Sequence, residues 1–449
     1  MQWLANLVYL IVGLLYLPVL LYQMLFQKKN RRGWLQRCGF VPLFDPARPR
    51  IWIHAVSLGE MNATRSLVNE IRSRRPDCDL VFSATTDTGY ARGVELYGAT
   101  HVFRFPLDFS FVVSRVLRRI APTAIVLMEL EVWYNLVTIA RRRNIPVAIA
   151  NGRLTQRSAQ RFQYIRFAAR RMFSALEWVG AQDKVIADRF LLVGVPADRV
   201  DMVGSVKWDT AHVSDSVDGD VALASALGLD GDRPIWVCGS TGNGEEELLI
   251  TVYRRLLAKW PEFARASHSN GGPTIQASAP PILVLVPRKP ERFNEVATLI
   301  SKAGHTCVRR SAHADGTTRP AITDGEVVLG DSMGELRKFY ALASVVLVGR
   351  SLVPMGGSDP MEVAALGKAM VIGPHTENFT EPVELLSDAN AIRVVDGAEE
   401  LPFVVGTLLS RPHICTKLGQ SAREVVLAQQ GATQRTADRV LALLPPAAT

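Results

Sequence analysis

Short apolar runs alternate with longer amphipathic stretches along most of this chain. The run Ile51–Val56 predicts a buried strand, and Asn62–Arg74 has the pattern of an amphipathic helix. Strands that alternate with helices in this way are typical of a parallel, doubly wound sheet. The first half predicts further strands at Leu80–Ala84, His101–Phe105, Ala124–Met128, Val147–Ala150, Trp178–Ala181 and Arg199–Met202.

A second set of strands follows a polar joint over residues 211–233. Because 449 residues exceed what one core usually holds, we expect an α/β chain with two tandem Rossmann-like domains and a central cleft. The domains are expected over 28–210 and 234–449, and the polar, low-complexity segment Ala264–Pro281 predicts a surface loop. The second set of strands is predicted at Ile235–Cys238, Ile282–Val286, Thr306–Arg309, Val327–Leu329, Val345–Val348 and Ala369–Ile372.

The first 27 residues form a separate apolar segment without a charged side chain. Its stretch Trp3–Phe26 has 24 residues, enough to cross a hydrocarbon core of about 30 Å as a helix that Pro18 kinks. The positive-inside rule then places the remaining chain in the cytoplasm, because four basic residues follow directly. A cleaved signal peptide is disfavoured, since neither a basic start nor a small-residue cleavage site is present. A helix that lies in the membrane surface stays open as the alternative. The four basic residues are Lys28, Lys29, Arg31 and Arg32.

The net charge of +8 is distributed unevenly between the two halves. Residues 28–210 hold 29 Lys and Arg against 16 Asp and Glu, whereas the remainder holds 22 against 27. The first half is therefore the part that we expect to meet an anion, whether a membrane, a nucleic acid or a phosphorylated substrate. A basic cluster at mostly helical spacing is either the binding surface or a solvated helix face. It comprises Arg153, Arg157, Arg161, Arg166, Arg170 and Arg171.

Cysteine and histidine patterns give no support for a metal site. The five cysteines are scattered without CxxC spacing, which fits a reducing compartment, and no HExxH motif occurs. The pairs Asp218-Gly-Asp220 and Asp230-Gly-Asp232 resemble a DxD metal motif, but they lie in the joint without a preceding buried strand, so turns are the better interpretation. We expect no metal and no cofactor.

Candidate catalytic residues of the first half follow predicted strands. Ligands of open α/β sheets bind beyond the carboxyl ends of the strands, and Glu60 stands there after Ile51–Val56. Its alternative role is a helix-start charge favoured by the helix dipole. Glu129 and Glu131 follow the strand Ala124–Met128 on one face, although Glu131 is better interpreted as a helix cap. Lys207 lies near the joint, either facing a leaving phosphate or as a solvated linker lysine.

Four turns of the second half have the composition of anion-binding sites. Gly239-Ser240-Thr241 lies between a strand and an acidic helix start, where backbone N–H groups bind anions. Arg288 in Val286-Pro287-Arg288 supplies a planar cation. Asp331-Ser332-Met333-Gly334-Glu335 opens a further helix, and Gly356-Gly357 precedes a Pro-started helix whose first turn bears Glu362, suited to a ribose. Together the turns favour a nucleotide.

These residues lie in motifs that resemble the bacterial 3-deoxy-D-manno-octulosonic acid (Kdo) transferases, membrane-anchored GT-B enzymes. The resemblance covers nearly the whole chain through HAVSLGE, MELEVW, IANGRL, GSVKWD, VPRKPERF, GDSMGEL and ALGKAMVIGPHTENF. It implies transfer of Kdo from CMP-Kdo, without a metal, to the lipid A precursor at the cytoplasmic side of the inner membrane in lipopolysaccharide synthesis. The implied partners are CMP-Kdo, an anionic lipid A-type acceptor and the membrane surface, with no nucleic acid.

Roles carry over by motif position. The resemblance implies that Glu60 is the general base of an inverting transfer and that Glu129 and Lys207 stabilise the transition state. It implies an acceptor domain over 28–210 and a donor domain over 234–449. The implied CMP-binding residues, together with those of the turns above, are Ser240, Thr241, Pro287, Arg288, Met333, Gly334, Glu335, Gly356, Gly357, Asp359, Pro360, Met361 and Glu362.

Departures from the family pattern cluster in the donor half. Lys289 replaces a histidine, Ser358 and Asp359 replace a His-Asn pair, and Arg350 stands where glycine is usual. STHEGEE becomes Ser240-Thr241-Gly242-Asn243-Gly244-Glu245-Glu246. Asp359 adds negative charge near an anionic donor, which Lys289 and Arg350 could compensate. Two alternatives therefore stay open: a GT-B enzyme with another nucleotide-sugar donor, and a CMP-sugar binder without catalysis.

Overall fold

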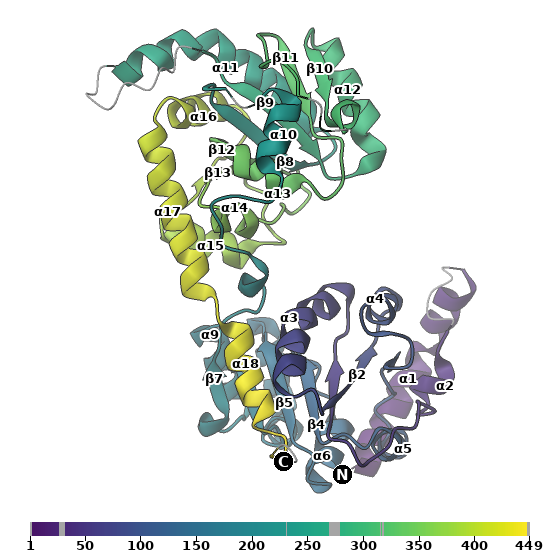
Figure 1. Cartoon of the computed structure of the whole chain (residues 1–449). Coiled ribbons are helices and arrows are strands. Elements are labelled where there is room, and N and C mark those ends of the chain that lie inside the picture. The colour runs from purple at the N-terminus through teal and green to yellow at the C-terminus, as the bar shows by residue number, and fades with distance from the viewer. Residues whose placement is uncertain are drawn as a thin grey trace. The chain divides into compact units, whose positions relative to one another are not determined.

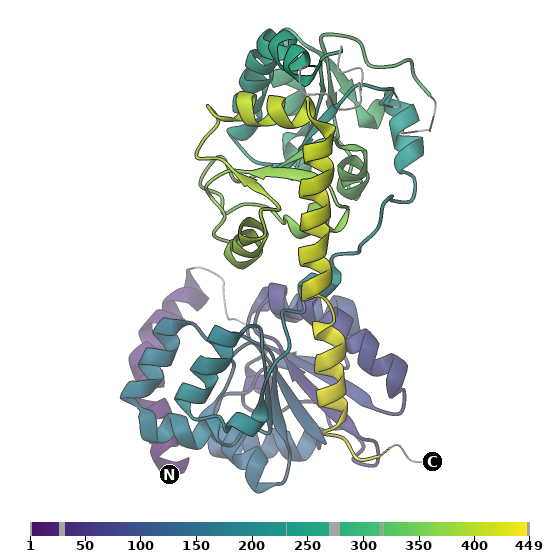
Figure 2. The same ribbon diagram turned by 90° about the vertical axis from the view of Figure 1, so that its left-hand side faces the viewer.

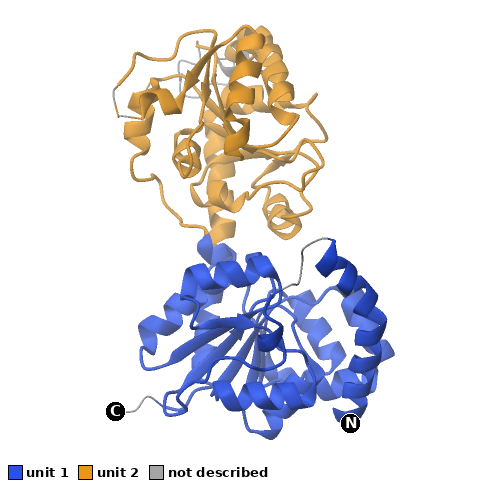
Figure 3. Cartoon of the chain, turned by 90° about the vertical axis from the view of Figure 1, so that its right-hand side faces the viewer, with its two compact units in different colours: residues 1–210, 429–449 blue, residues 211–428 orange. Residues whose placement is uncertain are grey.

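The computed structural model describes residues 2–26, 32–229, 231–268, 279–314, 316 and 318–446. It divides into two compact units, 1–210 with 429–449 and 211–428 (Figure 3). Most of the predicted loop 264–281, together with Lys28, Lys29 and Arg31 of the basic flank, lies outside the described residues.

Unit 1 is built on a seven-stranded parallel sheet in the order β3-β2-β1-β4-β5-β6-β7 (Figure 1). The chain leaves β1 for β2 on one side and returns as β4 on the other, so the switch point lies between β1 and β4. The strands are β1 (Arg50–His54), β2 (Asp79–Ala84), β3 (Val102–Arg104), β4 (Ala124–Met128), β5 (Val147–Gly152), β6 (Trp178–Ala181) and β7 (Val200–Met202). The helices are α1 (Gln2–Leu25), α2 (Trp34–Arg37), α3 (Leu58–Arg74), α4 (Asp87–Tyr97), α5 (Ser110–Ile120), α6 (Tyr134–Arg142), α7 (Gln156–Tyr164), α8 (Arg166–Phe173) and α9 (Lys184–Val193).

Both faces of this sheet are buried, which explains why its strands are continuous apolar runs rather than alternating ones. Successive side chains of β1 point to opposite faces, so that Trp52 joins one core cluster while Ile51 and Ile53 join the other. Each face needs helices over it, and the predicted alternation of strands and helices supplies them.

Unit 2 repeats the architecture with the strand order β10-β11-β9-β8-β12-β13-β14. Its switch point lies between β8 and β12. The strands are β8 (Ile235–Thr241), β9 (Ile282–Pro287), β10 (Thr306–Arg309), β11 (Glu326–Leu329), β12 (Val345–Val348), β13 (Ala369–Ile372) and β14 (Arg393–Val394), the last not predicted. The helices are α10 (Asp220–Leu227), α11 (Glu245–His268), α12 (Phe293–Lys302), α13 (Leu336–Leu342), α14 (Met361–Ala365), α15 (Thr380–Asp388), α16 (Leu401–Leu409) and α17 (Pro412–Gln429).

The predicted domain boundaries need two corrections. Residues 429–449 were expected in the second domain, but α18 (Ala432–Leu441) packs against α3 of unit 1 (Figures 1 and 2). Its Ala437 and Val440 complete the core cluster that contains Ile53. Residues 211–233, expected as a linker, belong to unit 2 and contribute α10.

Helix α1 confirms an apolar N-terminal helix, with Pro18 inside it. Among the described residues it is the one helix long and apolar enough to cross a membrane. It contacts α5 and α6 of unit 1.

Candidate active site

Glu60 lies in the first turn of α3, directly beyond the carboxyl end of β1. Its Oε2 accepts a hydrogen bond from the Val56 N–H at 2.8 Å, and its Oε1 accepts one from the Ser57 hydroxyl at 3.0 Å. The Ser57 oxygen in turn accepts from the Glu60 N–H at 3.4 Å. This arrangement is a variant of the capping box, in which Glu60 accepts from the N–H of Val56 rather than from that of the N-cap Ser57, and its Ser-x-x-Glu signature could have been read from the sequence. It also explains why the helix begins at Leu58 rather than at the predicted Asn62.

The surroundings of the Glu60 carboxyl nevertheless shift its pKa toward neutrality. Burial raises its pKa to about 7, and the Glu129 and Glu131 carboxylates reinforce the shift, against the hydrogen bonds from Val56 and Ser57. A carboxylate with a pKa near neutrality suits general base catalysis.

His54, the last residue of β1, is not a candidate for the general base. Burial lowers its pKa to about 3, and its ring stacks on Phe105. Its Nδ1 hydrogen-bonds the Ser83 hydroxyl and carbonyl groups. The imidazole is therefore neutral and has a structural role.

Glu129 and Glu131 follow β4, the other strand at the switch point of unit 1. Glu129 has a positive φ of 60°, uncommon for a residue other than glycine, and its main chain bonds to Ala150 and Arg153. Such backbone strain is frequent at functional sites. β1 and β4 are neighbours, so Glu60 and Glu129 follow adjacent strands.

The expected capping role of Glu131 is wrong. Its Oε2 accepts from the Trp133 indole at 3.2 Å, and burial raises its pKa. The start of α6 is capped instead by the buried Asp108, whose two oxygens accept from the N–H groups of Asn135 and Leu136, both at 2.8 Å. Asp108 comes from a different loop, which local sequence does not reveal.

Lys207 follows β7 and has an exposed side chain. Its backbone N–H donates to the Ser205 hydroxyl, and its carbonyl accepts from Thr210. Within the described residues, no hydrogen bond or ion pair joins Lys207 to Glu60 or Glu129. Its predicted role in catalysis stays a prediction.

A cavity of about 470 Å³ lies at the switch point of unit 2. The guanidinium-bearing Arg288 and Arg350 line it, together with the carboxylate-bearing Asp359 and Glu362. The cavity gathers five of the predicted donor residues, Ser240, Arg288, Gly357, Asp359 and Glu362, and adds Leu336, Tyr340, Arg350, Ser358, Asn378 and Phe379.

The backbone donors directly after the Gly239–Thr241 turn bind an acid of the chain, and the role of the turn itself stays a prediction. Glu245 is fully buried, and its Oε2 accepts from the N–H groups of Gly242 and Arg350 at 2.8 and 2.6 Å. Its Oε1 accepts from Ser351 and Leu352 at 2.9 and 3.0 Å. These backbone donors therefore bind a carboxylate of the chain itself.

Further residues around the end of β8 make buried contacts or have unusual backbone conformations. Thr241 is buried and donates to Glu246, which also pairs with Arg292 at 2.6 Å. Ser240 and Arg350 have φ values of 55° and 59°. Glycine adopts such values without strain, so the backbone at position 350 suits the glycine that the resemblance led us to expect there. Gly239 is required for another reason, since a Cβ there would collide with the Tyr340 ring.

The Met333–Glu335 segment does not line this cavity. Burial favours a higher pKa for the Glu335 carboxyl, but hydrogen bonds from Arg310, Ser332 and Lys338 together lower it to about 2. Met333 is 67% exposed, and Gly334 has a φ of 81°. This segment is therefore held by ion pairs at the start of α13.

The predicted donor residues Pro287, Gly356, Pro360 and Met361 are buried and do not line the cavity, whereas Ser358 and Asp359 between them do. Asp359 accepts a hydrogen bond from the Met361 N–H at 2.8 Å, just before α14, and Ser358 donates to the Ser240 carbonyl at 3.3 Å. Gly356 accepts from the Asn378 N–H. Pro287 ends β9, and Pro360 and Met361 begin α14.

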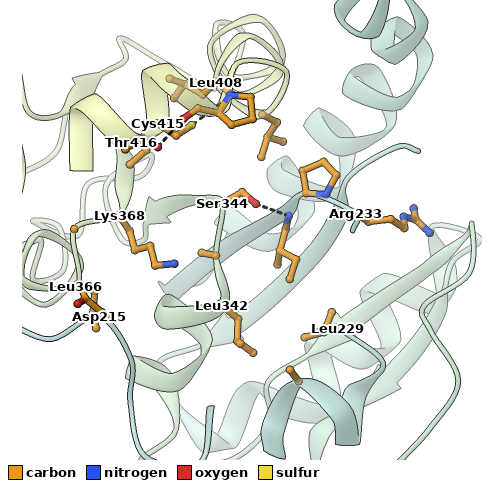
Figure 4. Close-up of a pocket in the computed structure, with 18 of the residues that line it drawn as sticks. Asp215, Leu229, Arg233, Leu342, Ser344, Leu366, Lys368, Leu408, Cys415 and Thr416 are labelled. Carbon is orange, nitrogen blue, oxygen red and sulfur yellow. Dashed lines mark hydrogen bonds between the residues drawn. The ribbon is translucent and has the colours of Figure 1, made fainter. Parts of the chain in front are cut away.

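A larger cavity of about 790 Å³ lies at the opposite, amino end of the strands of unit 2 (Figure 4). Lys368 points into it from the start of β13, and burial lowers its pKa. The two arginines that line it form ion pairs with acids of the chain. Arg423 pairs with Asp215 at 2.6 Å, and Arg233 pairs with Asp324 at 3.1 Å. Its position and these pairings disfavour it as the active site.

No group of three or more His, Cys, Asp or Glu side chains within the described residues has the arrangement of a metal site. The expectation that no metal or cofactor takes part stays a prediction.

Comparisons with known proteins identify the family of the chain. Residues 32–210 match the family described as 3-Deoxy-D-manno-octulosonic-acid transferase (kdotransferase). The chain is 34% identical to a 3-deoxy-D-manno-octulosonic acid transferase from Haemophilus influenzae, with 91% of each chain covered. It is 33% identical to the enzyme of that name from Bordetella pertussis, with 88% of this chain and 87% of the relative covered.

Among solved structures, UDP-GlcNAc 2-epimerase from Neisseria meningitidis bound to UDP-GlcNAc is similar in fold. It has a TM-score of 0.53 and 13% identity, and the match covers 88% of this chain and 100% of the epimerase. The two parallel sheets have the GT-B fold, which confirms the predicted fold class. With an acid at the switch point of unit 1, a cavity at that of unit 2 and these relatives, the chain belongs to the 3-deoxy-D-manno-octulosonic acid transferase family of glycosyltransferases.

Proposed function

We propose that this glycosyltransferase moves Kdo from CMP-Kdo to a lipid A precursor in lipopolysaccharide core synthesis, with inversion at the anomeric carbon. The observation that supports it most is Glu60, whose pKa is raised by burial to about 7 at the switch point of unit 1, in a chain of this family.

In the proposed mechanism the ionised Glu60 takes the proton of an acceptor hydroxyl. The hydroxyl oxygen forms a bond to the anomeric carbon of Kdo as the bond from that carbon to the phosphate of CMP breaks. A single displacement of this kind inverts the configuration. CMP leaves as the anion, and the proton on Glu60 passes to water. Glu129 and Lys207 are proposed to stabilise charge in the transition state.

The donor nucleotide is proposed to bind in the 470 Å³ cavity of unit 2. Its two arginines, Arg288 and Arg350, are suited to a phosphate, because a guanidinium offers several donors in one plane. Glu362 lies in the first turn of α14 and is proposed to accept hydrogen bonds from the ribose hydroxyls.

The acceptor and membrane partners are supported by the surface of α7 and α8. Tyr164, Ile165 and Phe167 are 89%, 56% and 72% exposed there. Apolar rings beside guanidinium groups suit an anionic lipid surface. We propose that this surface and α1 hold the enzyme at the cytoplasmic side of the inner membrane. The predicted arginines of 153–171 are all exposed in the same region.

Transfer is tested by incubating the full chain with CMP-Kdo and a tetraacylated lipid A precursor and measuring the product by mass spectrometry. We expect a mass increase of one or more Kdo residues, and the number of residues added is read from the same spectrum. No product, with CMP binding retained, would favour a CMP-sugar binder without catalysis.

The altered donor residues call for a direct measurement of nucleotide choice. Arg350 and Asp359 both line the cavity, and we expect CMP to raise the melting temperature of the full chain more than UDP or GDP does. A larger shift with UDP or GDP would contradict the CMP-Kdo assignment and favour another nucleotide-sugar donor.

The pH profile gives a second test of Glu60. We expect kcat/KM to fall about tenfold per pH unit below about pH 7, because protonated Glu60 cannot accept the hydroxyl proton. Glu131→Gln is expected to move this acidic limb to lower pH, since the Glu131 carboxylate helps to raise the Glu60 pKa. The exposed control Glu177→Gln is expected to leave it in place. A limb near the ordinary carboxyl pKa in the parent enzyme would contradict the raised pKa of Glu60.

A further inference from the structure

The first third of α1 is held on unit 1 by specific polar contacts. The Asn6 amide donates to the Ser110 hydroxyl at 2.7 Å, and its oxygen accepts from the Ser110 N–H at 2.9 Å and from the Asn135 amide at 3.0 Å. Asn6 thereby joins the starts of α5 and α6. A side chain that makes three such bonds defines a docking position for the helix.

Apolar contacts reinforce this position. The Tyr9 ring makes edge contacts with Phe109 and Trp133, with centroids 6.3 and 6.5 Å apart. Ala5 packs against the core cluster that contains Trp52. The amino-terminal end of α1 is therefore part of the folded body of unit 1.

The other end of α1 leads back to the same unit. Helix α2 follows at Trp34–Arg37, where Arg37 donates to the Thr85 carbonyl at 2.7 Å and Gln36 accepts from the Arg104 N–H at 3.0 Å. Figure 1 shows α1 beside unit 1, near α2 and α5. The amino-terminal end of α1 and the α2 helix that follows it in the chain are thus both bound to unit 1, whose sequence is strongly basic.

The rest of α1 is apolar and exposed. Leu14, Leu15 and Leu25 are 60%, 76% and 66% exposed. Phe111, next to the docking residue Ser110, is 61% exposed, and Leu35 of α2 is 72% exposed. This surface, here called the α1 surface, extends beyond the helix onto neighbouring parts of unit 1.

We propose that α1 lies in the surface of a lipid bilayer, with its ends on the same side, and does not cross it. The occupant of the α1 surface is the acyl boundary of an anionic leaflet, because exposed apolar side chains adjoin a basic domain. A crossing helix would carry Asn6 away from Ser110 and Asn135 and leave its amide in hydrocarbon. This inference rests on the membrane placement proposed above. It decides between the two alternatives for α1, a helix that crosses the bilayer and a helix that lies in the membrane surface.

Disulfide trapping tests the docked position. Asn6→Cys with Ser110→Cys is expected to form a disulfide when the purified full chain, with Cys38, Cys307 and Cys415 replaced by serine, is bound to phosphatidylethanolamine–phosphatidylglycerol vesicles. Leu15→Cys with Ser110→Cys is the control that should not form one. Trapping in detergent but not in vesicles would overturn the proposal.

Sidedness is measured without disturbing Asn6. In the same background, Trp3→Cys is expected to react with a membrane-impermeant maleimide in intact vesicles to the same fraction as Ser73→Cys on α3. Reaction of residue 3 only after detergent is added, with residue 73 reacting before, would show a crossing helix. A chain that does not float with the vesicles contradicts the membrane placement, and transfer to a detergent-dissolved acceptor measures the enzymatic function separately.

Discussion

Glu60→Gln is expected to lower the rate of Kdo transfer by about 10²- to 10⁴-fold, the usual contribution of a positioned general base. The amide has nearly the shape of the carboxylate and cannot accept the acceptor hydroxyl's proton. Glutamine also serves in a capping box, so the hydrogen bonding at the start of α3 is largely kept. Initial rates with CMP-Kdo and the lipid A precursor measure the effect.

A control variant and a binding measurement separate a loss of catalysis from a loss of folding. Glu70→Gln on the same helix changes a partly exposed i,i+4 pair with Arg74, 3.6 Å long, and should leave transfer unchanged. CMP binding by the Glu60→Gln protein, measured by calorimetry, should match that of the parent because the cavity lies in unit 2. Transfer at the parent rate by Glu60→Gln would remove Glu60 from the role of base.

Glu245→Gln is expected to destabilise unit 2 by about 2–5 kcal/mol, since each buried donor left unpaired costs about 1–3 kcal/mol. Each Glu245 oxygen accepts two backbone N–H groups, so whichever oxygen becomes an amide nitrogen leaves two donors without an acceptor. The loops that begin at Gly242 and Arg350 should then separate, and CMP affinity should fall. Hydrogen exchange at residues 242 and 350–352 of the full chain measures the local loss.

The adjacent Glu247 supplies the matched control. It is exposed, and Glu247→Gln should change neither exchange nor CMP affinity. Unchanged amide protection in the Glu245→Gln protein would mean that the carboxylate does not hold these loops together.

Much of the site was predictable because it depends on local pattern. Apolar runs mark strands that are buried on both faces, and residues directly after them must lie at the carboxyl edge of the sheet. Glu60, Glu129 and Arg288 were placed in this way. The start of α3 was missed by four residues, although the Ser57–Glu60 signature was present.

Other features depended on partners far along the chain. The Glu131 prediction failed because α6 is capped by Asp108, 27 residues before Asn135. The backbone N–H of Gly242, directly after the Gly239–Thr241 turn, is bound by Glu245, which also binds the N–H of Arg350, 105 residues away. The local sequence shows that an acid is present. It does not show which backbone N–H groups from distant parts of the chain the fold places beside that acid.

The sequence by itself determined the two parallel sheets, the apolar start and the strand ends that bear the candidate chemistry, because hydrophobic periodicity is a local property of the chain. Only the tertiary structure decided that α18 completes the core of unit 1, that Asn6 docks α1 beside α5 and α6, and that burial raises the pKa of Glu60. Each of these depends on which distant segments exclude water from one another, and that is settled when the sheets assemble.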